Sequence, residues 1–211
     1  MTELLWPLAI LTLPVLLLGY MAGVTRLAQH LLTPSRTLTA TDFVWLYVPF
    51  PVVVVGVYLA TVRPAVPVFE PLYLVAVPVG AVLYYGTTIA WQQYTGEPIR
   101  AGHRSLLGVA PGLLLAFPEE LLFRAGLAPL MDLVGPVGYT LVSAVAFGLY
   151  HQYLGRKEVV FKTLFGGALC VSYLLAGSVV VPMLVHFGYN LAFGLFVTGR
   201  GPVYNALAAP E

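Results

Sequence analysis

Two adjacent carboxylates, Glu119 and Glu120, stand inside an apolar stretch over residues 113–133 that is long enough to cross a bilayer. Arg124 follows them within the same stretch. Ionisable side chains at membrane depth are costly even on lenient insertion scales, so they mark functional sites by default. This stretch is therefore the first candidate for a site that performs chemistry.

The spacing of these three residues predicts different roles for the two acids. Glu120 and Arg124 are four residues apart, on one helix face and in the favourable acid-first order. We expect them to pair, because a buried carboxylate or guanidinium left alone is expensive. Glu119 points about 100° away around the helix, so it can face another partner and act as a general base. The alternative is a bridged ion pair that only fixes two helices.

Two histidines follow inside later apolar stretches. His151 lies four residues after Phe147, and His186 lies four residues before Asn190, so each pair shares a helix face. An imidazole can bind a metal or donate to an oxyanion, and an asparagine amide can complete an oxyanion hole. The structural alternative for His151 is a buried histidine whose hydrogen bonds are all made within the core. For His186 and Asn190 it is an interhelical hydrogen bond that serves packing, worth about 1 kcal/mol in membranes.

Together the three clusters predict one shared site in which a carboxylate and two imidazoles activate water, with or without a metal. A nucleophilic side chain is not favoured. Ser143 lies two turns before His151 and Ser178 lies at a turn, but neither has a base at suitable spacing. Cys170, the single cysteine, stands in an apolar run and is interpreted as a small helix-packing residue.

The composition sets the class of protein that must position these residues. Charged residues make up 9% of the 211 residues and hydrophobic ones 59%, whereas a soluble domain averages about 25% charged. We expect one integral membrane domain over residues 1–211, embedded in a lipid bilayer. The net charge of +1 argues against a nucleic-acid partner. The first residues lack a basic segment and are expected to form a retained membrane helix.

Hydropathy predicts an all-α, polytopic bundle of seven or eight transmembrane helices, with the motif-bearing core at about 106–198. An eighth crossing would come from splitting one kinked span. The seven predicted spans are 4–25, 43–62, 71–94, 106–131, 137–154, 159–176 and 179–198.

The basic residues predict the orientation. With seven spans, eight basic residues fall on one side, against Arg63 on the other, and the positive-inside rule makes the first side cytoplasmic. A conical cavity that opens to the cytoplasm could join the motifs at their different depths. In a prokaryote this would be the plasma membrane. The eight residues are Arg26, Arg36, Arg100, Arg104, Arg156, Lys157, Lys162 and Arg200.

The three motifs resemble those of the CAAX-protease and bacteriocin-processing (Abi) intramembrane endopeptidases, which include the type II CAAX prenyl endopeptidases. That signature is Glu-Glu-x-x-x-Arg, then Phe-x-x-x-His, then His-x-x-x-Asn or Asp. Here it is complete and in order, over about residues 113–195. The motifs begin at Glu119, Phe147 and His186.

The resemblance implies a mechanism and a substrate. Glu119 and His151 would activate a water for attack on a peptide carbonyl, and His186 and Asn190 would stabilise the oxyanion. Glu120 and Arg124 would hold the helix geometry. The substrate would be the C-terminus of a peptide or prenylated protein, which enters from the membrane and the cytoplasm and loses its last three residues.

The resemblance leaves the metal open. Zinc needs three protein ligands and an open position, which Glu119, His151 and His186 could supply. We favour a metal-free site, because Asn190 suits an oxyanion better and the sequence shows no further carboxylate paired with either histidine.

Two other classes of function stay open from the sequence. A proton-coupled transporter also uses intramembrane Glu and His, although no inverted repeat is found. An incomplete motif would favour a non-catalytic membrane partner or immunity protein, but all three motifs are complete here.

Overall fold

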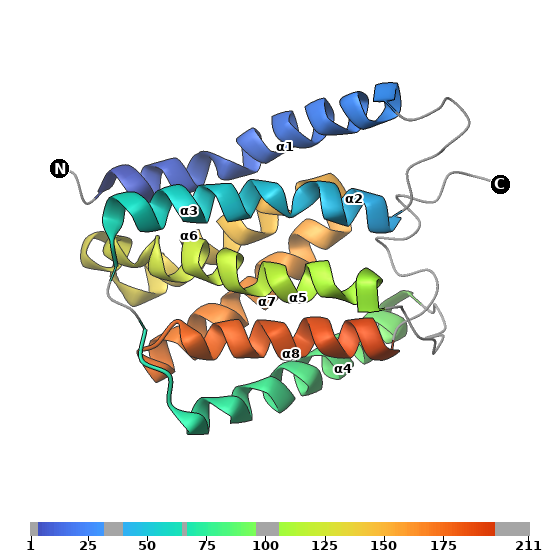
Figure 1. Ribbon diagram of the computed structural model, residues 1–211. Helices are drawn as coiled ribbons and strands as arrows, with labels where there is room; N and C mark the ends of the chain where they lie inside the picture. The colour runs from blue at the N-terminus through green and yellow to red at the C-terminus, as the bar shows by residue number, and fades with distance from the viewer. Residues whose placement is uncertain (1–3, 32–39, 65–66, 96–105, 197–211) are drawn as a thin grey trace.

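The computed structural model describes residues 4–31, 40–64, 67–95 and 106–196, and this part of the chain is helical without strands (Figure 1). The all-α prediction is therefore confirmed. Short 3₁₀ turns precede α4 and α6 and follow α6. The α-helices are α1 (Leu5–Leu31), α2 (Ala40–Tyr47), α3 (Pro49–Val62), α4 (Ala76–Thr95), α5 (Leu106–Glu120), α6 (Met131–Tyr150), α7 (Arg156–Ala176) and α8 (Val180–Phe196).

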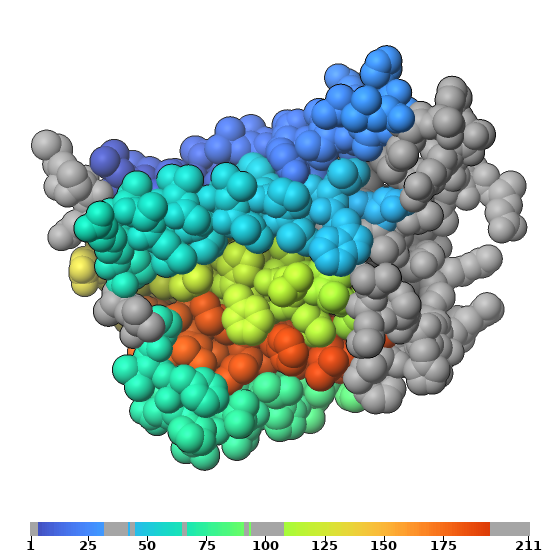
Figure 2. Space-filling model, in the orientation of Figure 1, coloured from blue at the N-terminus to red at the C-terminus, as the bar shows by residue number. Residues whose placement is uncertain are grey.

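The helices run side by side in two layers. In Figure 1, α1, α3, α5, α8 and α4 follow one another across the bundle, and neighbours in this series contact each other. Behind them, α6 packs against α7 and α1, and α7 also contacts α8. In the space-filling view of Figure 2, α5 and α8 reach the surface between α2–α3 and α4. The motif-bearing helices α5, α6 and α8 thus meet near the middle of the bundle.

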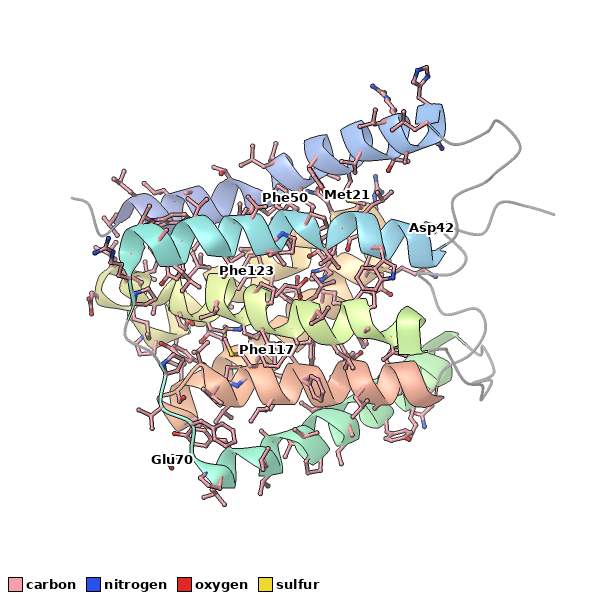
Figure 3. All side chains as sticks on the ribbon, viewed as in Figure 1. Met21, Asp42, Phe50, Glu70, Phe117 and Phe123 are labelled. Carbon is pink, nitrogen blue, oxygen red and sulfur yellow. The ribbon has the colours of Figure 1, made fainter. Side chains whose placement is uncertain are left out.

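The surface of the bundle is that of a membrane protein. Large apolar side chains cover its outside (Figure 3), and Leu175 is 84% exposed and Val137 75% exposed. Soluble monomers do not expose continuous apolar surface on this scale. Within the described residues, five helical segments are long and apolar enough to cross a bilayer, and the shorter Val180–Gly194 is also apolar. The chain is an integral membrane protein.

Two predicted spans are interrupted by proline or glycine. The span expected over 43–62 is divided at Val48 into α2 and α3, because Pro49 and Pro51 cannot donate the hydrogen bonds that would continue α2. In α6 the backbone of Gly135 is non-helical, with φ 70° and ψ 173°, directly before Pro136. Helix α6 as a whole begins at Met131, but the break at Gly135 separates a short first segment from the helix that continues from Pro136, close to the predicted start at 137.

The span expected over 106–131 is not one α-helix. Helix α5 ends at Glu120, and a π-helical turn, Leu121–Ala125, follows before a 3₁₀ turn. Pro118 lacks an amide hydrogen and loosens the preceding turn, which favours a wider register directly after it. Such π turns occur frequently at functional sites. The two glutamates therefore lie where the helix changes its winding.

Helix α7 begins at Arg156, three residues before the predicted start of this span, so Lys162 lies almost two turns inside the helix. It was counted above with the cytoplasmic basic residues, and that assignment stays a prediction. Four of the other residues in that count, Arg36, Arg100, Arg104 and Arg200, lie outside the described residues.

Candidate active site

Glu119, at the end of α5, has an imidazole on either side of its carboxylate. Its Oε1 lies 3.9 Å from His151 Nε2, and its Oε2 lies 3.8 Å from His186 Nε2. All three side chains are buried. These separations are too long for direct hydrogen bonds and short enough for one small molecule to touch all three groups. Residues from three motifs therefore meet at one place.

Each histidine is held through its other ring nitrogen. His151 Nδ1 lies 2.8 Å from the carbonyl oxygen of Phe147, and His186 Nδ1 lies 2.9 Å from Glu120 Oε1. A carbonyl only accepts, so Nδ1 of His151 carries the hydrogen, and a carboxylate selects the same tautomer in His186. In the neutral rings, both Nε2 atoms then present a lone pair towards Glu119.

Glu120 is the centre of a second, fully buried network. Arg124 Nε lies 2.9 Å from Glu120 Oε2, close enough for ionic attraction but not aligned as a hydrogen bond. Arg124 Nη1 donates to Ser143 Oγ over 2.8 Å, and Ser143 donates to the Phe123 carbonyl over 2.6 Å. The guanidinium also lies over the Phe147 ring, 5.0 Å from its centroid. The network joins α6 to the π turn, and the expected Glu120–Arg124 pair is present.

This network contains a carboxylate–histidine contact that the sequence did not reveal. The sequence showed no carboxylate paired with a histidine, and this counted against a metal. Glu120 is such a partner, because it bridges Arg124 and His186 through its two oxygens. The contact joins residues 66 positions apart, so no local spacing could predict it.

Asn190 has a different partner. Its Nδ2 donates to the carbonyl oxygen of Gly112 over 2.7 Å, which links α8 to α5. In the described part of the chain, no hydrogen bond or ion pair connects the Asn190 side chain to Glu119, His151 or His186. The side chain is partly buried, one turn after His186 on the same helix.

Tyr47 is a site residue that the sequence analysis missed. Its hydroxyl donates a 2.6 Å hydrogen bond to Glu119 Oε1, and its side chain is buried. It ends α2, far outside the motif-bearing core, and is one of 13 tyrosines in the chain. The only signal was a hydroxyl in a largely apolar span, and Tyr58 and Thr61 in the same span share it.

Close helix packing places the histidines. A Cβ on Gly188 would collide with the backbone of Val77, so α4 can approach α8 only because this residue is glycine. A Cβ on Gly148 would collide with Thr163 and the carbonyl of Val159 on α7. These contacts fix one side of α8 and of α6, which leaves His186 and the end of α6 directed towards α5.

The chemistry of the donors can be compared with that of zinc. A carboxylate and two imidazoles with oriented Nδ1 atoms are ligand types that zinc accepts. Within the described residues, however, no group of three His, Cys, Asp or Glu side chains is arranged closely enough to hold a metal ion. We therefore derive no step through a metal.

A family model described as type II CAAX prenyl endopeptidase, Rce1-like, matches residues 102–192. This segment contains all three motifs, and of the helices that carry them only the end of α8 lies beyond it. No curated protein and no solved structure matches the chain.

Proposed function

We propose that this chain, whose residues 102–192 match the type II CAAX prenyl endopeptidase model, is an intramembrane endopeptidase of the CAAX-protease and bacteriocin-processing family. Its substrate is the C-terminal segment of a membrane-associated peptide or prenylated protein. The observation that carries the proposal is the buried carboxylate of Glu119 between two imidazole Nε2 atoms, 3.9 and 3.8 Å away. An ion pair that served packing alone would not need two such nitrogens held in one orientation.

The proposed reaction uses a water bound to Glu119. The carboxylate accepts a proton as the water oxygen attacks the scissile carbonyl, and His151 orients the water through Nε2. His186, when it carries both protons, keeps Nδ1 on Glu120 and donates from Nε2 to the oxyanion. Glu119 then returns its proton to the leaving amine, and the C–N bond breaks. Arg124 keeps Glu120 in place throughout.

We propose that the bundle makes seven crossings. The 43-residue segment Gly108–Tyr150 is long enough for two of them, and the apolar Val180–Gly194 supplies the last. The basic residues at the start of α7 then lie in the cytoplasm, in a prokaryotic plasma membrane. A conical cavity open to that side would admit the peptide, while the lipid group stays between helices.

A peptide-cleavage assay tests the function. Purified protein in detergent is incubated with a fluorogenic, farnesylated Cys-a-a-X peptide, and mass spectrometry identifies the products. We expect release of an intact tripeptide, and none from the His186→Ala variant. Absence of cleavage of both farnesylated and unmodified peptides by the folded protein would refute the proposal.

The metal-free mechanism has its own test. We expect activity to survive a strong chelator and purified protein to contain less than stoichiometric zinc. One zinc per chain, lost together with activity, would reverse the preference.

Replacing Tyr47 by phenylalanine should lower kcat by about 10-fold or more, with little change in KM. The variant removes a hydrogen bond to a charged group, and such bonds contribute about 1.5–3 kcal/mol. Tyr47 is a positioning residue that holds Glu119 towards the water.

Tyr20→Phe is the matched control for Tyr47→Phe. Its hydroxyl donates to the Leu46 carbonyl over 2.9 Å, beside Tyr47 but without contact with Glu119. Equal kcat values in the two phenylalanine variants would show that the Tyr47 hydroxyl serves packing only.

For Asn190→Ala we expect kcat to fall by about 100-fold, as after loss of an oxyanion-hole donor. The Asn190–Gly112 hydrogen bond would then be a resting arrangement from which the amide turns to the substrate. Gln152→Ala is the control, because its amide also links two helices, donating to the Pro14 carbonyl over 3.0 Å. If Asn190→Ala lowers thermal stability but leaves kcat unchanged, the amide is structural.

A further inference from the structure

Lys162 is a basic side chain in the second turn of α7, within a segment apolar enough to cross a membrane. None of the three motifs includes it. A lysine at this depth is costly unless it meets an anion, water or an aromatic face. Its surroundings therefore indicate what it binds.

Two aromatic rings hold the Lys162 ammonium. Nζ lies 5.7 Å from the centroid of the Phe165 ring and 5.6 Å from that of Tyr189. The two rings contact each other, with centroids 4.2 Å apart. Cation–π contacts of this kind fix the position of a charge without neutralising it. The side chain is only partly buried.

Among the residues that the structure describes, protein carboxylates do not neutralise this charge at contact distance. Glu158, one turn earlier on α7, is buried and interacts electrostatically with Lys162. Among the described residues, however, no carboxylate lies within ion-pair distance of the ammonium. A positioned cation that lacks such a partner can still bind an anionic ligand.

The same aromatic rings connect Lys162 with the candidate active site. The Phe165 ring packs edge-on against the His186 ring, with centroids 5.2 Å apart. The distance from Nζ to the centroid of the His186 ring therefore cannot exceed the sum of this length and the 5.7 Å between Nζ and the Phe165 centroid. The charge also interacts electrostatically with Glu119 and His151.

We propose that Lys162 binds the free C-terminal carboxylate of the substrate peptide, three residues beyond the bond that is cleaved. The inference depends on the proposed endopeptidase function. Three extended residues span about 10 Å, which the upper limit on the separation between the imidazole and the ammonium allows. A carboxylate bound there would place the third peptide bond from the C-terminus beside Glu119, so Lys162 would set how many residues are removed.

Two peptides that differ only in their C-terminus test this inference. One farnesylated peptide ends in a free carboxylate and the other in a neutral carboxamide. For the unmodified enzyme we expect kcat/KM to favour the free acid by about 10- to 100-fold, as for a hydrogen bond to a charged group. Lys162→Met should cleave both peptides at similar rates, and Lys162→Arg should retain the preference.

Lys157→Met is the matched control, since Lys157 is exposed near the start of the same helix. It should keep the preference of the unmodified enzyme. If the unmodified enzyme cleaves acid and amide equally, or if Lys162→Met still prefers the acid, the carboxylate site is refuted while the endopeptidase function stands. Cleavage of neither peptide would refute the function itself. Should Lys162→Met fail to fold, the acid-to-amide ratio of the unmodified enzyme still decides.

Discussion

Replacing Glu119 by glutamine is expected to lower kcat/KM for peptide cleavage by about 10²–10⁴-fold, the usual contribution of a general base. The amide has nearly the same shape and can still accept the hydrogen bond from Tyr47, but it cannot take a proton from water. The measurement is steady-state cleavage of the fluorogenic peptide. Thermal unfolding should change little, because the carboxylate has no ion pair shorter than 3.8 Å.

Glu70→Gln is the control for this change, because Glu70 is exposed and lies ahead of α4, away from the motifs. It should retain full activity. If Glu119→Gln cleaves the peptide at the rate of the unmodified protein, Glu119 is not the base and the mechanism fails.

Arg124→Ala is expected to destabilise the folded protein by about 3–5 kcal/mol, as breaking a buried ion pair does. The change leaves the Glu120 carboxylate buried without its cation and removes the hydrogen bond to Ser143. Of the residues that the structure describes, His186 alone would remain as a partner of Glu120. Thermal unfolding in detergent, followed by tryptophan fluorescence, measures the loss.

A double variant separates the unpaired charge from lost packing. In Arg124→Met with Glu120→Gln, no charge remains unpaired, so part of the lost stability should return. Arg156→Ala, at the exposed start of α7, should unfold like the unmodified protein. A fully stable Arg124→Ala protein would contradict the role assigned to the pair.

The sequence was sufficient wherever contacts follow helix periodicity. Residues four apart share a face, so the Glu120–Arg124 pair and the Phe147–His151 contact could be predicted. Apolar runs likewise indicated a helical membrane protein, because only helices and closed barrels satisfy the backbone in lipid. The predicted ends of the helices differed from the structure where proline and glycine interrupt the apolar runs.

The tertiary structure alone decided which atoms meet between distant segments. It placed Tyr47 on Glu119 across 72 positions and directed Glu120 to His186 across 66. It also showed that residues 121–125 form a π turn and that Lys162 lies over the Phe165 ring, which packs against His186. Periodicity specifies the face of one helix, whereas rotation and height between helices depend on side-chain packing, such as that of Gly188 against α4. That packing has no signature within a single stretch of sequence.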